Sequence, residues 1–184
     1  MADRLDLQRL SAGLRRMGWI RFWIQTTLGV VVVGILLFSK VGNSLQRNAD
    51  QVIGLGPGIS LTTLAFFVLL YSLWQGWLIV RLGRSLNSEA RPSRGEASRL
   101  IKRGILSDLF GLIVSVVGYQ SLAGVLFIQA ARQQPGLSIG ARMGNYSITS
   151  LEMLSVMSNT QVLFAHMIGL TFSLWMLQRI YRTS

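Results

Sequence analysis

Four polar side chains recur every seven residues near the C-terminus, at Glu152, Asn159, His166 and Ser173. Seven residues are close to two turns of an α-helix, so these groups share one face if the helix extends back to residue 152. Polar groups are costly in an apolar segment and usually face a bundle interior or a partner. This row could form interhelical hydrogen bonds, ligate a cation or line a transport path.

His166 is the only histidine of the chain, and three roles are open to it. A neutral imidazole could form an interhelical hydrogen bond, ligate a metal or the magnesium of a bound chlorin, or belong to a transport path. One imidazole does not make a metal site, because good sites need several convergent ligands. The metal therefore stays unknown, with iron and chlorophyll as the possible cofactors.

Asp108 and Glu152 are the only acids within reach of a membrane site. We expect Asp108 at the inner mouth of the third apolar stretch, where it could pair with Lys102, Arg103 or an arginine of the N-terminal segment. The chain has no cysteine. No nucleophile and base arrangement, phosphate-binding glycine loop or metalloprotease motif occurs. The sequence therefore predicts a protein that is not an enzyme.

Four long apolar stretches without Asp, Glu, Lys or Arg organise the chain. A helix needs roughly 20 apolar residues to cross the hydrocarbon layer of a membrane. Each stretch is long enough, the first only if a snorkelling Arg21 is included. We predict an all-α, integral membrane four-helix bundle in a single membrane domain, 1–184. Its spans are expected at about 19–38, 61–80, 109–131 and 154–178.

The 18 Lys and Arg residues are distributed unevenly between the connectors. Five precede the first span, seven lie in the connector 81–108 and two follow the last span, against four in the other connectors. The positive-inside rule then places both termini and the connector 81–108 on the inner side, and the five tryptophans fall on the same half. An anionic inner leaflet is the expected partner, and nucleic acid is not. The basic residues expected at that surface include Arg15, Arg16, Arg21, Arg94, Arg99, Lys102 and Arg103.

Two segments on this inner side have helical patterns of their own. Leu7, Leu10, Leu14 and Met17 recur at spacings of three and four, which predicts a short amphipathic helix on the inner surface. The segment 93–96 reads Ser-Arg-Gly-Glu, which fits a capping box and predicts a helix start that could run on into the third span.

Small residues mark one face of the third span. Gly104, Gly111, Ser115 and Gly118 follow steps of four and three that also include Asp108. Small side chains let a neighbouring backbone approach closely in a membrane, so this face is expected to pack against another helix. Separately, residues 71–74 and 172–175 end the second and fourth spans with a shared Ser-Leu-Trp, which hints at a duplicated hairpin.

The chain resembles the small four-helix membrane proteins of cyanobacteria and plastids, a family that includes the chloroplast inner-envelope translocon subunit also described as the permease in chloroplasts. The resemblance rests on the basic and aromatic segment 15–25, on residues 91–94, on Asn159-Thr160 and on Ala165-His166. It implies a cyanobacterial plasma or thylakoid membrane, or a plastid inner envelope. We expect the cyanobacterial setting, because no transit-like presequence precedes the first amphipathic segment. Glu152 stands where the family commonly has an aspartate.

Three functions follow from the residues and the resemblance. The first is a non-enzymatic accessory or scaffold protein for the translocation or assembly of other membrane proteins, with a membrane-protein partner or as a homo-oligomer. The second is a small permease for iron or another cation along the face of Glu152, Asn159 and His166. The third is a pigment-binding subunit that uses His166.

Overall fold

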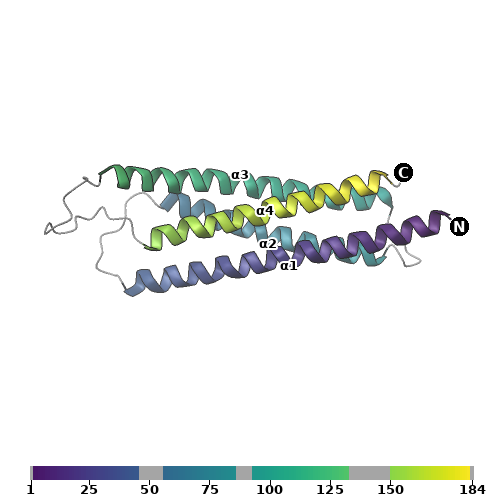
Figure 1. Ribbon diagram of the computed structural model, residues 1–184, viewed down its shortest axis with the longest axis horizontal. Helices are drawn as coiled ribbons and strands as arrows, with labels where there is room; N and C mark the ends of the chain where they lie inside the picture. Colours follow the sequence, from purple (N-terminus) through teal and green to yellow (C-terminus); the bar gives the residue numbers. More distant parts are fainter. Residues whose placement is uncertain (1, 46–55, 86–92, 133–149, 183–184) are drawn as a thin grey trace.

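A computed structural model describes residues 2–45, 56–85, 93–132 and 150–182, and within these ranges the chain is helical with no strand. The helices are α1 (Ala2–Leu45), α2 (Gly56–Ser85), α3 (Arg94–Arg132) and α4 (Ser150–Arg182) (Figure 1). All four are long and apolar enough to cross a membrane. The chain is therefore a multi-pass integral membrane protein with the predicted all-α architecture.

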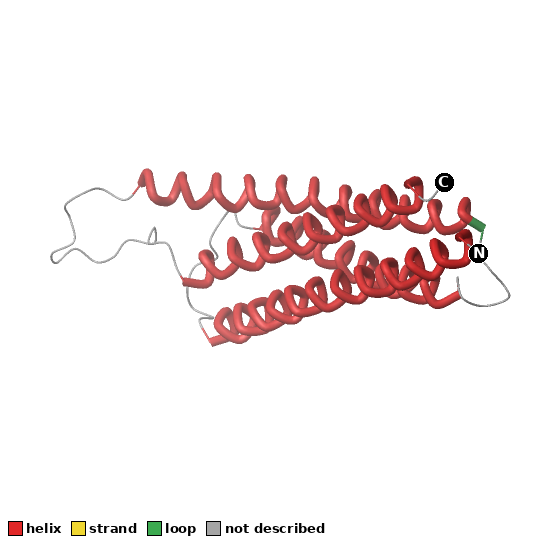
Figure 2. The backbone as a smooth tube through the Cα atoms, turned by 45° about the vertical axis from the view of Figure 1, so that its right-hand side comes forward, coloured by secondary structure: helices red, strands yellow, loops and turns green. Residues whose placement is uncertain are grey.

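The helices form a four-membered bundle in which sequence neighbours lie side by side. α1 packs against α2 and α4, and α3 packs against the same two helices. α2 and α4 also touch across the bundle, so α1 and α3 face each other over the longer diagonal. Both termini lie at one end, in Figure 1 and again in the rotated view of Figure 2.

α1 and α3 begin at this end, and α2 and α4 finish there. We call it the basic end because of the cations that it carries. The predicted inner-surface residues Arg15, Arg16, Arg99, Lys102 and Arg103 are exposed near it. The side chain of Arg94, which belonged to the same prediction, lies outside the described residues. Positive charge is thus concentrated at one end of the bundle.

The start of α1 differs from the separate surface helix that its amphipathic pattern predicts. Residues 2–45 form one continuous helix, in which Leu14 is fully buried and the Ser11 hydroxyl donates to the Gly83 carbonyl at 2.7 Å. Gly18 lies against Val80, and Gly83 lies against Arg15. The two glycines let α1 and α2 approach closely, so the described part of this apolar face, at Leu14 and Met17, packs within the bundle.

The predicted start of α3 is confirmed by its hydrogen bonds. The Ser93 amide donates to Glu96 Oε2 at 3.0 Å, and the Glu96 amide donates to Ser93 Oγ at 3.2 Å. This reciprocal pair is a capping box, which satisfies two amides that the first turn of a helix leaves without partners. α3 then continues from the basic end through the third span without interruption.

Two apolar clusters form the interior. The cluster nearer the basic end contains Leu14, Ile79, Ile101 and Met176, and the other contains Val32, Ala65, Val114 and Val162. Each cluster takes residues from all four helices. The stretch of bundle between them is polar, and it holds the candidate site.

Candidate functional site

Arg21 is the centre of the polar stretch. The sequence predicted that this arginine snorkels to the inner surface, but its side chain is fully buried. Its Nη2 lies 2.9 Å from Asp108 Oδ2, so α1 and α3 are joined by an ion pair across the long diagonal of the bundle. An unpaired charge at this depth is costly, and the carboxylate offsets much of that cost. The expected pairing of Asp108 with an arginine of the N-terminal segment is present.

The Arg21 guanidinium also contacts the other helices. Nη1 donates to Ser173 Oγ of α4 at 2.5 Å, and Nη2 donates to Ser72 Oγ of α2 at 2.9 Å. Nε donates to Gln25 Oε1 one turn along α1, at 3.3 Å. A guanidinium has only donors, and here they meet acceptors on all four helices. One side chain therefore links the whole bundle.

Asp108 accepts from several sides. Oδ1 accepts from the Ser72 hydroxyl at 2.5 Å and from Gln25 Nε2 at 3.5 Å, and it lies 3.3 Å from His166 Nδ1. The other ring nitrogen of His166 lies 3.1 Å from the Ala65 carbonyl oxygen of α2. His166 is thus held from both sides by α2 and α3. Of its three possible roles, the interhelical hydrogen bond is the one this geometry contains.

The predicted polar row on α4 lies against the predicted small-residue face on α3. Gly104 lies beside Ser173 and the Arg21 guanidinium, Gly111 faces His166, and Gly118 faces Asn159. A methyl group added at Gly111 would overlap the imidazole ring, and one added at Gly118 would lie 3.1 Å from Asn159 Oδ1. The helices run antiparallel, so each step of seven along α3 matches a step of seven back along α4. The glycines supply the space that the polar side chains fill.

Asn159 forms a second polar contact, further from the basic end. Its Nδ2 donates to the Ser115 carbonyl of α3 at 2.9 Å, and its Oδ1 accepts from the Thr62 hydroxyl of α2 at 2.9 Å. The Ser115 hydroxyl is not part of this contact, because it donates to the Gly111 carbonyl within α3. Asn159 therefore joins three helices but stays separate from the Arg21 network.

Glu152 lies at the far end of the row. It is 3% exposed, and its Oε1 accepts from Gln129 Nε2 of α3 at 3.0 Å. The four members of the predicted row are therefore all buried, yet they belong to three places along the bundle. Within the row, only His166 and Ser173 belong to the Arg21 network: His166 contacts Asp108, and Ser173 contacts Arg21.

Three residues of the site were not predicted: Gln25, Ser72 and Gly169. A methyl group on Gly169 would overlap the Gln25 amide and the Asp108 carboxylate, so this position has to be small. The sequence did contain a clue to Ser72, because Ser72 and Ser173 hold the same position in the two Ser-Leu-Trp segments. Both serines bind the same guanidinium, one from α2 and one from α4.

Comparison with known proteins places the chain in a family. Residues 4–181 match the family described as a protein of unknown function, DUF3611. The chain belongs to the DUF3611 family. It is also 26% identical over 176 residues to the Arabidopsis thaliana protein named "Protein TIC 21, chloroplastic". The matched region covers 95% of this chain and 58% of that relative, and no solved structure matches.

The likeness to a chloroplast protein confirms the predicted resemblance to a family of plastids and cyanobacteria. With four helices that are able to span a bilayer, it supports a multi-pass protein of a plastid or cyanobacterial membrane. This DUF3611 chain spans about 58% of the length of its relative. Because the match covers 95% of this chain, the likeness includes its four membrane helices.

Neither an iron ion nor a chlorophyll fits the His166 site as it stands. Among the described residues, no three His, Asp or Glu side chains converge, and the Arg21 guanidinium lies where a cation would need ligands. The His166 ring is fully buried, with oxygen atoms of Ala65 and Asp108 beside its two nitrogens. A chlorin needs an open face beside the ligating nitrogen. In this DUF3611 protein, Gly111 closes onto the ring instead.

Proposed function

We propose that this DUF3611 protein is a non-enzymatic accessory or scaffold subunit that acts in the translocation or assembly of membrane proteins in a photosynthetic membrane. The observation that carries the proposal is the closure of the Arg21 and Asp108 network. Its buried donors and acceptors, from four helices, are occupied by one another. Such a network fixes the relative positions of the helices and favours a rigid membrane body.

Close packing around the network supports the same conclusion. Gly111 and Gly169 leave no room for an added carbon beside His166, Gln25 or Asp108. A transport path needs space for its cargo and side chains that exchange partners. A scaffold needs neither, because its interior only has to hold its outer surfaces in place. The predicted resemblance to a family that includes a translocon subunit agrees with a role beside other membrane proteins.

Affinity purification after crosslinking in native membranes tests this proposal. The tagged chain should bring down a reproducible set of membrane proteins under mild detergent. The set should be lost or reduced in Asp108→Asn, in which the buried pair is broken, and it should be retained in the control Thr171→Val, which changes an exposed residue of α4. A chain that is recovered alone in every preparation, with or without crosslinking, would contradict a scaffold role. An absorption spectrum of the same eluate should show no pigment bound in proportion to the protein.

A small permease for iron or another cation is the second candidate. It is favoured by the polar contacts that follow one another along the bundle, from Glu152 through Asn159 to His166 and Arg21. The fixed positive charge of Arg21 opposes the passage of a cation. Uptake of ferrous iron into proteoliposomes decides between the candidates.

If the protein is a permease, His166→Ala and Glu152→Gln should reduce uptake, whereas the exposed Thr171→Val of α4 should not. If it is a scaffold, uptake should equal that of protein-free vesicles in all four preparations. Substantial uptake by the unmodified protein would therefore overturn the first proposal. Equal uptake in all variants would exclude the route along α4.

We also propose that the basic end faces the inner side of the membrane, with both termini inside. The exposed cations at this end and the positive-inside rule support this orientation. The accessory role then places the charged surface on the side where proteins are synthesised or delivered.

A further inference from the structure

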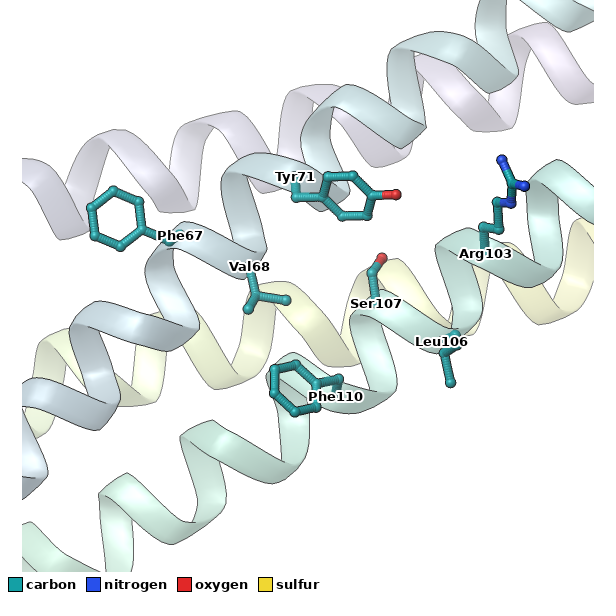
Figure 3. Close-up of a pocket in the computed structure, with 7 residues that line it drawn as sticks. All are labelled: Phe67, Val68, Tyr71, Arg103, Leu106, Ser107 and Phe110. Carbon is teal, nitrogen blue, oxygen red and sulfur yellow. The ribbon is translucent and has the colours of Figure 1, made fainter.

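A groove of about 740 Å³ runs along the outside of the bundle between α2 and α3. Its walls come from Phe67, Val68 and Tyr71 of α2 and from Arg103, Leu106 and Phe110 of α3 (Figure 3). It lies on the outer surface of the two spans, away from the Arg21 network. The groove is therefore open to the lipid phase.

The chemistry of the groove changes from one end to the other. Arg103 stands at the end nearer the basic end, whereas Phe67 and Phe110 stand at the opposite end (Figure 3). Phe67 is 62% exposed and Phe110 is 52% exposed, so both rings present their surface to a ligand. From Arg103 to Phe110 the helix rises about 10 Å. The groove thus offers one cationic end and an apolar channel of about 10 Å.

The Arg103 charge is not matched by a carboxylate among the described side chains. Asp108 is paired with Arg21, Glu96 is held in the capping box, and Glu152 accepts from Gln129. Arg103 itself is exposed on the groove side of α3. An anion that reached this end would meet a guanidinium with its donors available.

Tyr71 supplies a second donor at the same end. Gln75 Nε2 donates to the Tyr71 hydroxyl oxygen at 2.7 Å, which leaves the phenolic proton to be donated elsewhere. The hydroxyl points toward the Arg103 end of the groove (Figure 3). Ser107 adds no donor, because its hydroxyl already donates to the Gly104 carbonyl.

The depth of this end agrees with the position of a lipid headgroup. Trp74 is 57% exposed and follows Tyr71 by one turn toward the basic end, and the two rings meet edge to face. Exposed indole rings favour the boundary between headgroups and hydrocarbon. We therefore expect the Arg103 end of the groove at the level of the phosphate groups and the phenylalanines at the level of the acyl chains.

We propose that this groove is a binding site for an acidic glycerophospholipid. Arg103 and Tyr71 bind its phosphate, and one acyl chain lies along Val68, Leu106, Phe67 and Phe110. A net negative lipid is selected because a zwitterionic headgroup brings its own cation to the site. The site is distinct from general attraction to an anionic leaflet, because it depends on one arginine beside a shaped groove.

Native mass spectrometry of the purified full chain tests this site, with phosphatidylglycerol and phosphatidylcholine of identical acyl chains as probes. The unmodified protein should retain phosphatidylglycerol in preference to phosphatidylcholine. Arg103→Gln should weaken phosphatidylglycerol binding about five- to tenfold, the range expected for the loss of one cation at a lipid phosphate. Tyr71→Phe should cause a smaller loss, because it removes one neutral donor.

The matched control is Arg99→Gln, which removes the same charge from an exposed site one turn nearer the basic end, outside the groove. It should leave binding within about twofold of the unmodified chain, since an exposed cation outside the groove makes no direct contact with the bound phosphate. Thermal melting of each variant checks that folding is unchanged. Equal losses in Arg99→Gln and Arg103→Gln, or equal retention of the two lipids, would overturn the proposal. A dimer that buries the groove and excludes both lipids would overturn it as well.

Discussion

The imidazole of His166 occupies the space that a side chain on Gly111 would need. This contact is one of three in which a glycine of α3 meets a polar residue of α4 at intervals of seven residues. It ties the packing of two helices to the hydrogen bonds of Asp108, because His166 Nδ1 lies 3.3 Å from that carboxylate. Changes at the glycine should therefore disturb the polar site directly.

Gly111→Ala should destabilise the bundle by about 1–3 kcal/mol, the usual cost of overpacking a well-packed interior. The added methyl group has to displace the His166 ring from Asp108 and Ala65. Unfolding in mixed detergent and sodium dodecyl sulfate, followed by circular dichroism, measures the loss. Gly124→Ala on the same helix is the control, since nothing lies within 4 Å of its added carbon. Equal stability of both variants would refute the close contact.

Removal of one partner of the Arg21 and Asp108 pair should be severe. Asp108→Asn leaves the Arg21 guanidinium buried without a counter-charge. Arg21→Gln leaves the Asp108 carboxylate buried without a counter-charge. Each should cost about 3–5 kcal/mol in the free energy of unfolding. The double variant should cost less than the sum of the two, because the residual amides no longer leave a bare charge. Strictly additive losses would show that the two groups do not interact.

Asn159→Ala should cost about 1–2 kcal/mol, since it removes hydrogen bonds to Thr62 and Ser115 within the membrane. Thr62→Val should cost less, and the double variant should add little to Asn159→Ala. Thr160→Ala is the neighbouring control, because Thr160 is exposed and donates only to the Val156 carbonyl of its own helix. The same unfolding titration reports all four. A loss in Thr160→Ala as large as in Asn159→Ala would contradict the assignment.

The capping box predicts a local effect at the start of α3. Ser93→Ala should cost about 1 kcal/mol and should speed amide hydrogen exchange in the first turn of α3. Glu96→Gln should have a smaller effect, because an amide still accepts from the Ser93 amide. Exchange near Asp108 should stay unchanged in both variants. Uniform acceleration along the whole helix would instead indicate a global loss of stability.

Orientation can be measured on single cysteines, because the chain has none of its own. Gly95→Cys lies at the basic end and Gly56→Cys at the opposite end, both exposed and with room for the new side chain. In intact cells, a membrane-impermeant maleimide should label only Gly56→Cys. In inverted vesicles it should label only Gly95→Cys. The reverse pattern would place the termini outside.

Much of the architecture could be predicted, because long apolar stretches and the one-sided charge each depend on local sequence. The lengths of the helices could not. α1 is one helix from Ala2 to Leu45, and its part around Arg15 and Gly18 packs against Gly83 and Val80 of α2, which is a contact between distant segments. The same limit applies to Arg21. Its burial depends on Asp108, which lies 87 residues away in the chain.

The candidate site was visible in parts. The row on α4 and the small-residue face on α3 were each evident from spacing, but nothing local indicated that one would face the other in antiparallel register. Gln25 stands one helical turn after Arg21, yet a single amide in an apolar segment has too many possible partners for a prediction. Ser72 had a counterpart in Ser173, and only the shared guanidinium gives that likeness a physical meaning.

The matching repeats of α3 and α4 have a further effect on how the chain assembles. The glycines of α3 and the polar residues of α4 both repeat every seven residues, so a shift of seven residues between the helices would still place a glycine opposite a polar group. These two rows alone therefore do not define the register of the helices. Asp108 occurs once in that repeat, and Arg21 reaches it from a different helix. The ion pair therefore fixes the register of α3 and α4, and without it the two helices could pair two turns out of register.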